Sequence, residues 1–441
     1  MTCGRTLTTI AATLLLVSCG VAPASSSNAS DTAAVRPTAT DAEPGGDTSS
    51  MPVPTPTDSA STEVAQGITD VEAAFPARLA LTTKDGQVLT FSPHEDPVVT
   101  PGVMAPTGKV VVSASFMAGR TMVEWHHLRN DEISASVQID GDFHPTAVAQ
   151  DGKLVALVGS SGTTTTVVLA TPSAGEMRRW TFDAVLVPEA FANAFDPTGD
   201  GLPMGVFVIE YLAADTYRVR VIDTATGTLG LPLNLRDKGQ SVDEIMTAVS
   251  RTAVFEPNNQ LLFTLYQDAS EGGENVGSFI HTLGLFNGVW CLDVPRELGL
   301  ADHPGALAVS PDGLRLFAAS TIGGLAGYAV NDITNYGPEM PEARAVASLA
   351  PAVDAVAIGA SDTQVVVALG GSIFRRDPAT LAGTDSFTWD MSVQALTVLD
   401  DGSIVIVGSG RMTLVSPDDR ILAERVLPAG TGEVTRVAVV G

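Results

Sequence analysis

The stretch Gly305-Ala-Leu-Ala-Val-Ser-Pro-Asp-Gly-Leu-Arg-Leu-Phe-Ala-Ala-Ser320 contains two apolar, strand-like runs on either side of Pro311-Asp312-Gly313. In such a turn, proline supplies a fixed negative φ, and glycine adopts a positive φ at little cost. A tight hairpin uses both properties. The stretch therefore predicts a β-hairpin, and it is the template against which the rest of the chain can be compared.

The same arrangement recurs six more times along the chain. The further turns lie at Thr107-Gly108, Asp151-Gly152, Asp200-Gly201, Asn258-Asn259, Ser361-Asp362 and Asp401-Gly402. The seven turns are spaced by about 40–60 residues, which is the period of one propeller blade. Two more strand candidates follow most turns, for example 217–222 and 412–415. Four strands per unit are typical of a blade.

The two ends of the repeat region complement each other. The run 434–440 looks like an inner strand without a blade, whereas 78–82 and 87–91 look like outer strands without an inner one. We therefore expect the C-terminal run to complete the N-terminal blade and close the ring. The predicted fold is an all-β propeller of eight four-stranded blades. Seven blades are the alternative, because the first two units are short and could merge.

Near the N-terminus, Leu16-Val17-Ser18-Cys19-Gly20 ends an apolar run that follows Arg5. That run is too short to span a bilayer as a helix. The arrangement resembles a bacterial lipoprotein signal. The resemblance implies that residues 1–18 are removed and that a lipid is attached to the Cys19 thiol. The alternative is a plain secretory signal, cut after Ala22 or Ala24.

Three segments follow from this pattern: a signal peptide over 1–18, a tether over 19–66 and the propeller over 67–441. The tether is rich in Ser, Thr, Pro and Ala with almost no large apolar residue, so we expect it to be disordered. The expected location is outside the cytoplasm, anchored by lipid to a bacterial membrane. Of the three cysteines, only Cys291 would remain free, and its apolar surroundings predict a buried thiol.

The charge balance restricts the partners. The chain has 50 acidic and 24 basic side chains, a formal net charge of −26. Such a surface repels phosphate backbones and anionic lipid headgroups, which argues against nucleic-acid binding and against direct docking on a membrane. The membrane contact we expect is the lipid anchor alone.

The repeat Ala308-Val-Ser-Pro-Asp-Gly-Leu-Arg-Leu-Phe-Ala-Ala-Ser320 resembles that of bacterial YVTN-type, lactonase-like and amine-dehydrogenase-heavy-chain-like propellers. The stretch 211–228 is similar to the outer hairpin of the same proteins. The resemblance covers most of the chain after residue 77, but it is strong in one repeat only. It implies the fold and not an activity, since propellers include both enzymes and binding scaffolds.

Two groups of residues are candidates for a metal site. Asp196, Thr198 and Asp200 precede Gly201 with the spacing of half a calcium loop, but Phe207 stands where a closing Glu belongs. We favour a plain Asp-Gly turn. His144 and His303 both open inner-strand runs, so they could share the channel face of the propeller. We favour chance placement over a metal site there, and we expect no cofactor.

No familiar catalytic motif occurs: there is no Gly-x-Ser-x-Gly elbow, no phosphate-binding loop and no His-Glu-x-x-His. The acidic run 268–274 predicts a long loop that could bind a partner. We therefore expect a binding or scaffolding protein, with an envelope protein or a glycan as partner, and no enzymatic activity. The alternatives are a lactonase-like propeller enzyme and a subunit of an envelope redox complex.

Overall fold

The computed structural model describes residues 75, 78–93, 95–192, 202–214, 216–234, 240, 241, 243, 245–247, 250–256, 258, 260–267, 279–284, 288–295, 298, 304–334, 341–349 and 353–440. In this part of the chain the only α-helix is the five-residue α1 (Val330–Thr334); the rest of the regular structure is β. No helix among these residues has the length and apolar character needed to cross a membrane.

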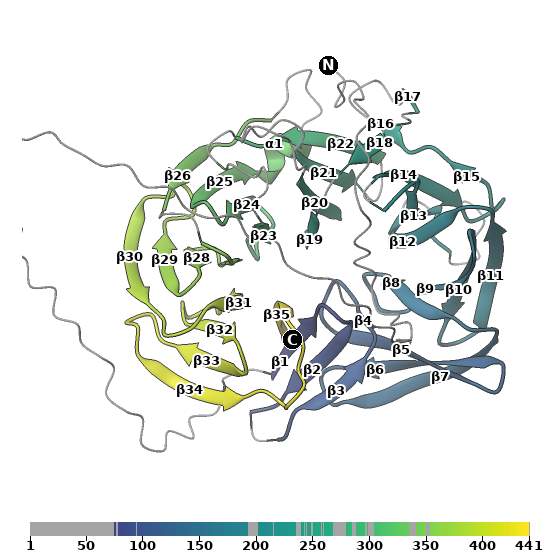
Figure 1. Ribbon diagram of the computed structural model, residues 1–441, viewed down its shortest axis with the longest axis horizontal. Helices are drawn as coiled ribbons and strands as arrows, with labels where there is room; N and C mark the ends of the chain where they lie inside the picture. The colour runs from purple at the N-terminus through teal and green to yellow at the C-terminus, as the bar shows by residue number, and fades with distance from the viewer. Residues whose placement is uncertain are drawn as a thin grey trace, which may run out of the picture. The chain divides into compact units, whose positions relative to one another are not determined.

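The strands form eight sheets, which are the blades of a propeller (Figure 1) and are antiparallel apart from one short parallel pairing at the edge of blade 5. Blade 1 contains β35 (Val434–Val440), β1 (Arg78–Thr83), β2 (Gln87–Phe91) and β3 (Val98–Pro101). Blade 2 contains β4 (Val103–Met104), β5 (Val110–Met117), β6 (Arg120–His127) and β7 (Glu132–Asp140). Blade 3 contains β8 (His144–Val148), β9 (Val155–Ser161), β10 (Thr164–Thr171) and β11 (Gly175–Phe182).

Blades 4 and 5 have additional strands. Blade 4 contains β12 (Val185–Ala192), β13 (Gly205–Tyr211), β14 (Thr216–Asp223), β15 (Leu229–Gly230) and β18 (Ile245–Thr247). Blade 5 contains β19 (Ser250–Glu256), β20 (Leu261–Gln267), β21 (Phe279–Gly284) and β22 (Gly288–Asp293), with β16 (Leu233–Asn234) and β17 (Gln240–Ser241) at its outer edge.

The last three blades are regular. Blade 6 contains β23 (Gly305–Val309), β24 (Arg315–Ser320), β25 (Gly324–Ala329) and β26 (Ala345–Ser348). Blade 7 contains β27 (Val356–Ala360), β28 (Val365–Leu369), β29 (Ser372–Arg376) and β30 (Gly383–Thr388). Blade 8 contains β31 (Val393–Val398), β32 (Ile404–Gly408), β33 (Arg411–Val415) and β34 (Ile421–Val426). The prediction of four-stranded blades is confirmed, and eight is the correct number.

The inner hairpins use the turn chemistry that the sequence indicates. In blade 6, the Asp312 carboxylate accepts a hydrogen bond from the Leu314 N–H at 2.9 Å, and Gly313 has a φ of 70°. Blades 3 and 8 repeat this arrangement, with Asp151 and Asp401 each accepting from the N–H two residues later at 2.9 Å. A residue with a side chain is strained at positive φ, so glycine is required after each Asp.

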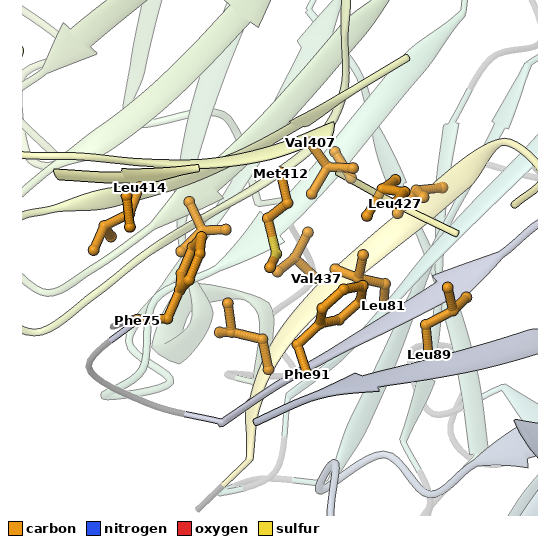
Figure 2. Close-up of a cluster of buried hydrophobic side chains, with 14 of the residues drawn as sticks. Phe75, Leu81, Leu89, Phe91, Val407, Met412, Leu414, Leu427 and Val437 are labelled. Carbon is orange, nitrogen blue, oxygen red and sulfur yellow. The ribbon is translucent and has the colours of Figure 1, made fainter. Parts of the chain in front are cut away.

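The ring closes through blade 1, as predicted. The C-terminal β35 pairs with β1 in an antiparallel register that includes Leu79 opposite Val439 and Leu81 opposite Val437. Behind this pair, apolar side chains of blades 8 and 1 pack against each other, among them Phe91, Met412 and Val437 (Figure 2). Each buried side chain of this size contributes about 1.5–3 kcal/mol of apolar burial. The closing strand therefore joins the two ends of the chain by hydrogen bonds and by packing.

Candidate functional site: a tyrosine–arginine cluster between blades 4 and 5

The inner strands all begin at one face of the ring, which we call the upper face. The connections between the second and third strands of each blade also lie there. In seven blades these connections have two to four residues, whereas in blade 5 the connection is 268–278. The connection from β15 of blade 4 to β19 of blade 5 is also long, 231–249. The longest connections between strand ends at this face therefore belong to blades 4 and 5.

Part of this chain links the two blades. After β15, the chain adds β16 in parallel to β22 of blade 5, where Asn234 pairs with Val289. It then returns to blade 4, and β18 pairs with the upper half of β14. The backbones of β12 and β19 themselves make only sparse contact, in contrast to the closely packed inner strands from β19 round to β35. Side chains therefore carry much of the junction between blades 4 and 5 near the channel.

An ion pair crosses this junction. Glu189 lies in β12 at a register shift between Pro188 and Ala190, which is a β-bulge. Its Oε2 accepts a hydrogen bond from Nη1 of Arg251, the second residue of β19, at 2.8 Å. Bulges re-aim side chains and are frequent beside functional sites. The two side chains retain exposed fractions of 13% and 28%, so a ligand in solvent can reach them.

Three tyrosines pack behind the ion pair. The ring of Tyr217 lies 5.9 Å from that of Tyr211 in an edge-to-face arrangement and 5.3 Å from that of Tyr266. The ring of Tyr266 then contacts Phe279 at 5.2 Å and His281 at 5.9 Å. Tyr266 and Phe279 stand at the two ends of the 268–278 connection. Together with Glu189 and Arg251, these residues form what we call the tyrosine–arginine cluster.

Burial and neighbouring charges shift the pKa values of the arginine and of two tyrosines in the cluster. Burial alone would lower the pKa of Arg251, but the Glu189 carboxylate and the nearby tyrosines raise it overall. Burial raises the pKa of Tyr217 and of Tyr266, and Tyr266 also shares a hydrogen bond with Arg251. Both phenols are therefore neutral at physiological pH. They can exchange hydrogen bonds but are poor bases.

Two buried polar atoms of the cluster have no hydrogen-bond partner among the described residues: the Tyr217 hydroxyl and Nδ1 of His281. Burial lowers the pKa of His281 to about 4, so the ring is neutral near pH 7. Buried side-chain atoms without a partner also occur in other blades, for example Nε of Arg376 and Nε of Arg411, so these two atoms support a functional site only together with the ion pair and the tyrosines.

The opposite side of blade 4 is also charged near the upper face. The Glu210 carboxylate, which is largely buried, accepts hydrogen bonds from Arg218 at 2.7 Å and from Arg220 at 3.3 Å. Arg218 also binds Asp243, of the 231–249 connection, at 2.9 Å. This network anchors the additional chain to the blade.

The sequence-predicted site residues lie elsewhere. His144 is the first residue of β8, the inner strand of blade 3, and is exposed. Burial nevertheless lowers its pKa, and the Asp142 carboxylate opposes that shift. Cys19, His303, the calcium candidates Asp196, Thr198 and Asp200, and the run 268–274 lie outside the described residues, so these assignments stay predictions.

Cys291 is buried and forms no disulfide among the described residues, as its apolar surroundings predict. Within the part of the chain that the structure describes, no three His, Cys, Asp or Glu side chains gather as a metal site would require.

The tyrosine–arginine cluster was not predicted from the sequence. A compositional signal was present, because the chain has only five tyrosines and three of them are Tyr211, Tyr217 and Tyr266. Each stands at the upper end of its strand. Glu189 and Arg251 carried no comparable signal in the sequence. Their pairing depends on a β-bulge and on how blade 4 is positioned against blade 5.

No known family profile matches the sequence, and no curated protein matches it either. Among solved structures, the chain is similar to BamB from Moraxella catarrhalis, with 15% identity, coverage of 77% of this chain and 90% of that one, and a TM-score of 0.47. It is also similar to apo AztD from Citrobacter koseri, with 11% identity, coverage of 82% and 96%, and a TM-score of 0.45. Likenesses at this level of identity concern the fold alone and assign no function.

Proposed function

We propose that this protein is a lipid-anchored binding protein of the bacterial cell envelope, and that it engages its partner at the upper face of blades 4 and 5. The observation that carries the proposal is the unequal length of the upper-face connections. Connections that vary while the blades stay regular are where such folds bind. The long connections coincide with the only junction at which an ion pair, three tyrosines and two unpartnered polar atoms meet among the described residues.

The chemistry of the cluster favours binding over catalysis. Arg251 and Glu189 neutralise each other, and the phenols are held neutral by burial. Neutral tyrosines and a paired arginine recognise hydroxyl, amide and carboxylate groups on a partner surface, as they do in protein interfaces. An envelope protein or a glycan offers these groups.

The decisive experiment places a photo-crosslinking amino acid at one of two matched positions. Leu212 is 46% exposed in the upper-face connection of blade 4, and Leu314 is 48% exposed in the hairpin of blade 6 at the opposite face. In envelope fractions, the Leu212 position should give a discrete crosslinked partner, and the exchange Glu189→Gln should weaken that product. Equal crosslinking from Leu314, or none from Leu212, would contradict the proposal.

An assay of hydrolytic activity is the second test. We expect the purified protein to hydrolyse neither lactones nor simple esters. Lactone hydrolysis that disappears in His144→Ala would establish the lactonase-like alternative instead.

The anchor has a separate test. Cys19→Ser should release the protein from membranes or stall its processing. An unchanged mature size and membrane fraction, both in this variant and when lipoprotein processing is inhibited, would exclude lipidation at Cys19.

A further inference from the structure

A second feature lies in blade 1, at the channel and far along the ring from the tyrosine–arginine cluster. Arg436 is the third residue of β35, the innermost strand of its sheet, where it pairs with Thr82. Its side chain is exposed to solvent, yet surrounding protein atoms lower the pKa of its guanidinium. A side chain on the innermost strand of a blade, exposed on one side and flanked by protein on the other, has both properties. Figure 1 shows β35 on the inner side of the ring.

Arg436 has no carboxylate partner among the described residues. Ten other arginines in that part of the chain form ion pairs with Asp or Glu. The nearest acid in sequence, Glu433, instead pairs with Lys84 at 3.2 Å. The one hydrogen bond from Arg436 goes from Nη2 to the Pro106 carbonyl at 3.2 Å. Arg129, Arg315, Arg376 and Arg425 also form no ion pair among the described residues. Arg436 combines this lack of a carboxylate partner with a position on an innermost strand.

The free donors of Arg436 indicate what would bind there. A guanidinium keeps its charge at any physiological pH and presents five N–H donors in a planar fork. The Pro106 carbonyl takes one of them. The remaining donors match the two oxygens of a carboxylate, or of a phosphate, in a bidentate geometry. Partial desolvation strengthens such a pair, because the effective dielectric constant near the wall is lower than in bulk water.

A second donor group lies on the neighbouring inner strand. Gln394 of β31 accepts a hydrogen bond through Oε1 from the Val434 N–H at 3.2 Å. This bond fixes the amide group against β35, two residues before Arg436, and it leaves the Nε2 amide as a further donor.

We infer that Arg436 anchors an anion-binding site in the channel wall between blades 1 and 2, which takes a carboxylate or phosphate group of a ligand. The site is independent of the proposed contact surface at blades 4 and 5, because no residue is shared between them. Either one can be wrong while the other holds.

The test compares anions at matched ionic strength. The melting temperature of the purified full-length protein would be measured in chloride, inorganic phosphate and acetate over a concentration series. A ligand that binds only the folded state raises this temperature in a saturable way. We expect a saturable rise with phosphate or acetate over chloride, and at least a tenfold weaker apparent affinity in Arg436→Gln. The preferred anion then distinguishes a phosphate ligand from a carboxylate ligand.

The matched control is Arg129→Gln. Arg129 is exposed, and the exchange removes the same charge, so this variant should keep the wild-type response. An equal response in Arg436→Gln, or no anion-specific response in the wild type, would overturn the inference.

A chemical readout covers the case in which the variant does not fold. Phenylglyoxal modification of Arg436 in the wild type, quantified by peptide mass analysis, should slow in the effective anion. An unchanged rate at a saturating concentration would also overturn the inference.

Discussion

Two arginines each join neighbouring blades, but their surroundings differ. Arg375 of β29, only 4% exposed, reaches from blade 7 to blade 8. It donates to the Ser416 carbonyl at 3.0 Å, to Asp419 at 3.0 Å and to the Gln364 side chain at 3.3 Å. Arg251, at the junction of blades 4 and 5, pairs with Glu189 and Tyr266. Beside it, however, the Tyr217 hydroxyl and His281 Nδ1 have no partner among the described residues.

If the proposed function holds, this difference separates a structural junction from a binding one. Each guanidinium nitrogen of Arg375 has a hydrogen-bond partner, although Nε of Arg376 and Nε of Arg411 in the same blades have none among the described residues. The upper-face connections of blades 7 and 8 have two residues each. Around Arg251, two buried polar atoms have no hydrogen-bond partner among the described residues, and the upper-face connections of blades 4 and 5 are long. Real proteins depart from full satisfaction mainly at functional sites. Under the proposed function, blades 7 and 8 maintain the ring, whereas blades 4 and 5 present the contact surface.

The largest expected effect tests whether both regions belong to one cooperative unit. Deletion of 431–441 removes β35 and leaves β1 as an open edge in an incomplete ring. We expect calorimetry to show that the single unfolding transition is lost, with blades 4 and 5 affected as strongly as blade 8.

The control for this deletion is Val439→Thr at an exposed position of the same strand, which should melt like the wild type. If the truncated protein melted like the full-length chain, the closing role of β35 would be wrong, and the two regions could be separate units.

Features of the fold and of the candidate site could be predicted from the sequence only where they depend on residues close together along the chain. The Pro-Asp-Gly hairpin is local, so the turn at Gly313, the repeat and the closing run were readable from residue order. The bulge at Glu189 and its pairing with Arg251, 62 positions later, depend on how one blade is placed against the next. The same holds for Arg436, whose hydrogen bond to the Pro106 carbonyl depends on the position of the neighbouring blade.

The second prediction compares the two arginines directly. Arg375→Met removes one member of a buried ion pair and leaves Asp419 without its partner, so it should cost about 3–5 kcal/mol of unfolding free energy. Arg251→Met should cost only about 1 kcal/mol, because that pair is partly solvated. Urea denaturation monitored by circular dichroism measures both. Equal losses of unfolding free energy would mean that Arg251 contributes as much to the stability of the fold as Arg375.

The third prediction concerns acid stability at the junction of blades 4 and 5. The folded-state pKa of His281, about 4, lies below its ordinary value of 6.5. The unfolded chain therefore takes up a proton first as the pH falls. The stabilising contribution is complete above pH 6.5 and is lost as the pH falls toward 4, by about 3 kcal/mol in all.

His281→Gln should flatten the dependence of unfolding free energy on pH in this interval. The matched variant His127→Gln, at an exposed position of β6, should keep the wild-type slope. A slope unaffected by the exchange at position 281 would show that His281 does not carry the acid sensitivity.

The smallest expected effect distinguishes a functional hydroxyl from a structural one within the tyrosine–arginine cluster. The Tyr266 hydroxyl shares a hydrogen bond with Arg251, so Tyr266→Phe should cost about 1 kcal/mol. The Tyr217 hydroxyl is buried without a partner, so Tyr217→Phe removes only a desolvation penalty and should stabilise the protein by up to about 1 kcal/mol. If Tyr217 is retained for binding, the same variant should weaken the crosslink from position 212 while raising the melting temperature. Destabilisation by Tyr217→Phe, with the crosslink unchanged, would instead assign that hydroxyl to the fold and remove the contrast with the junction at Arg375.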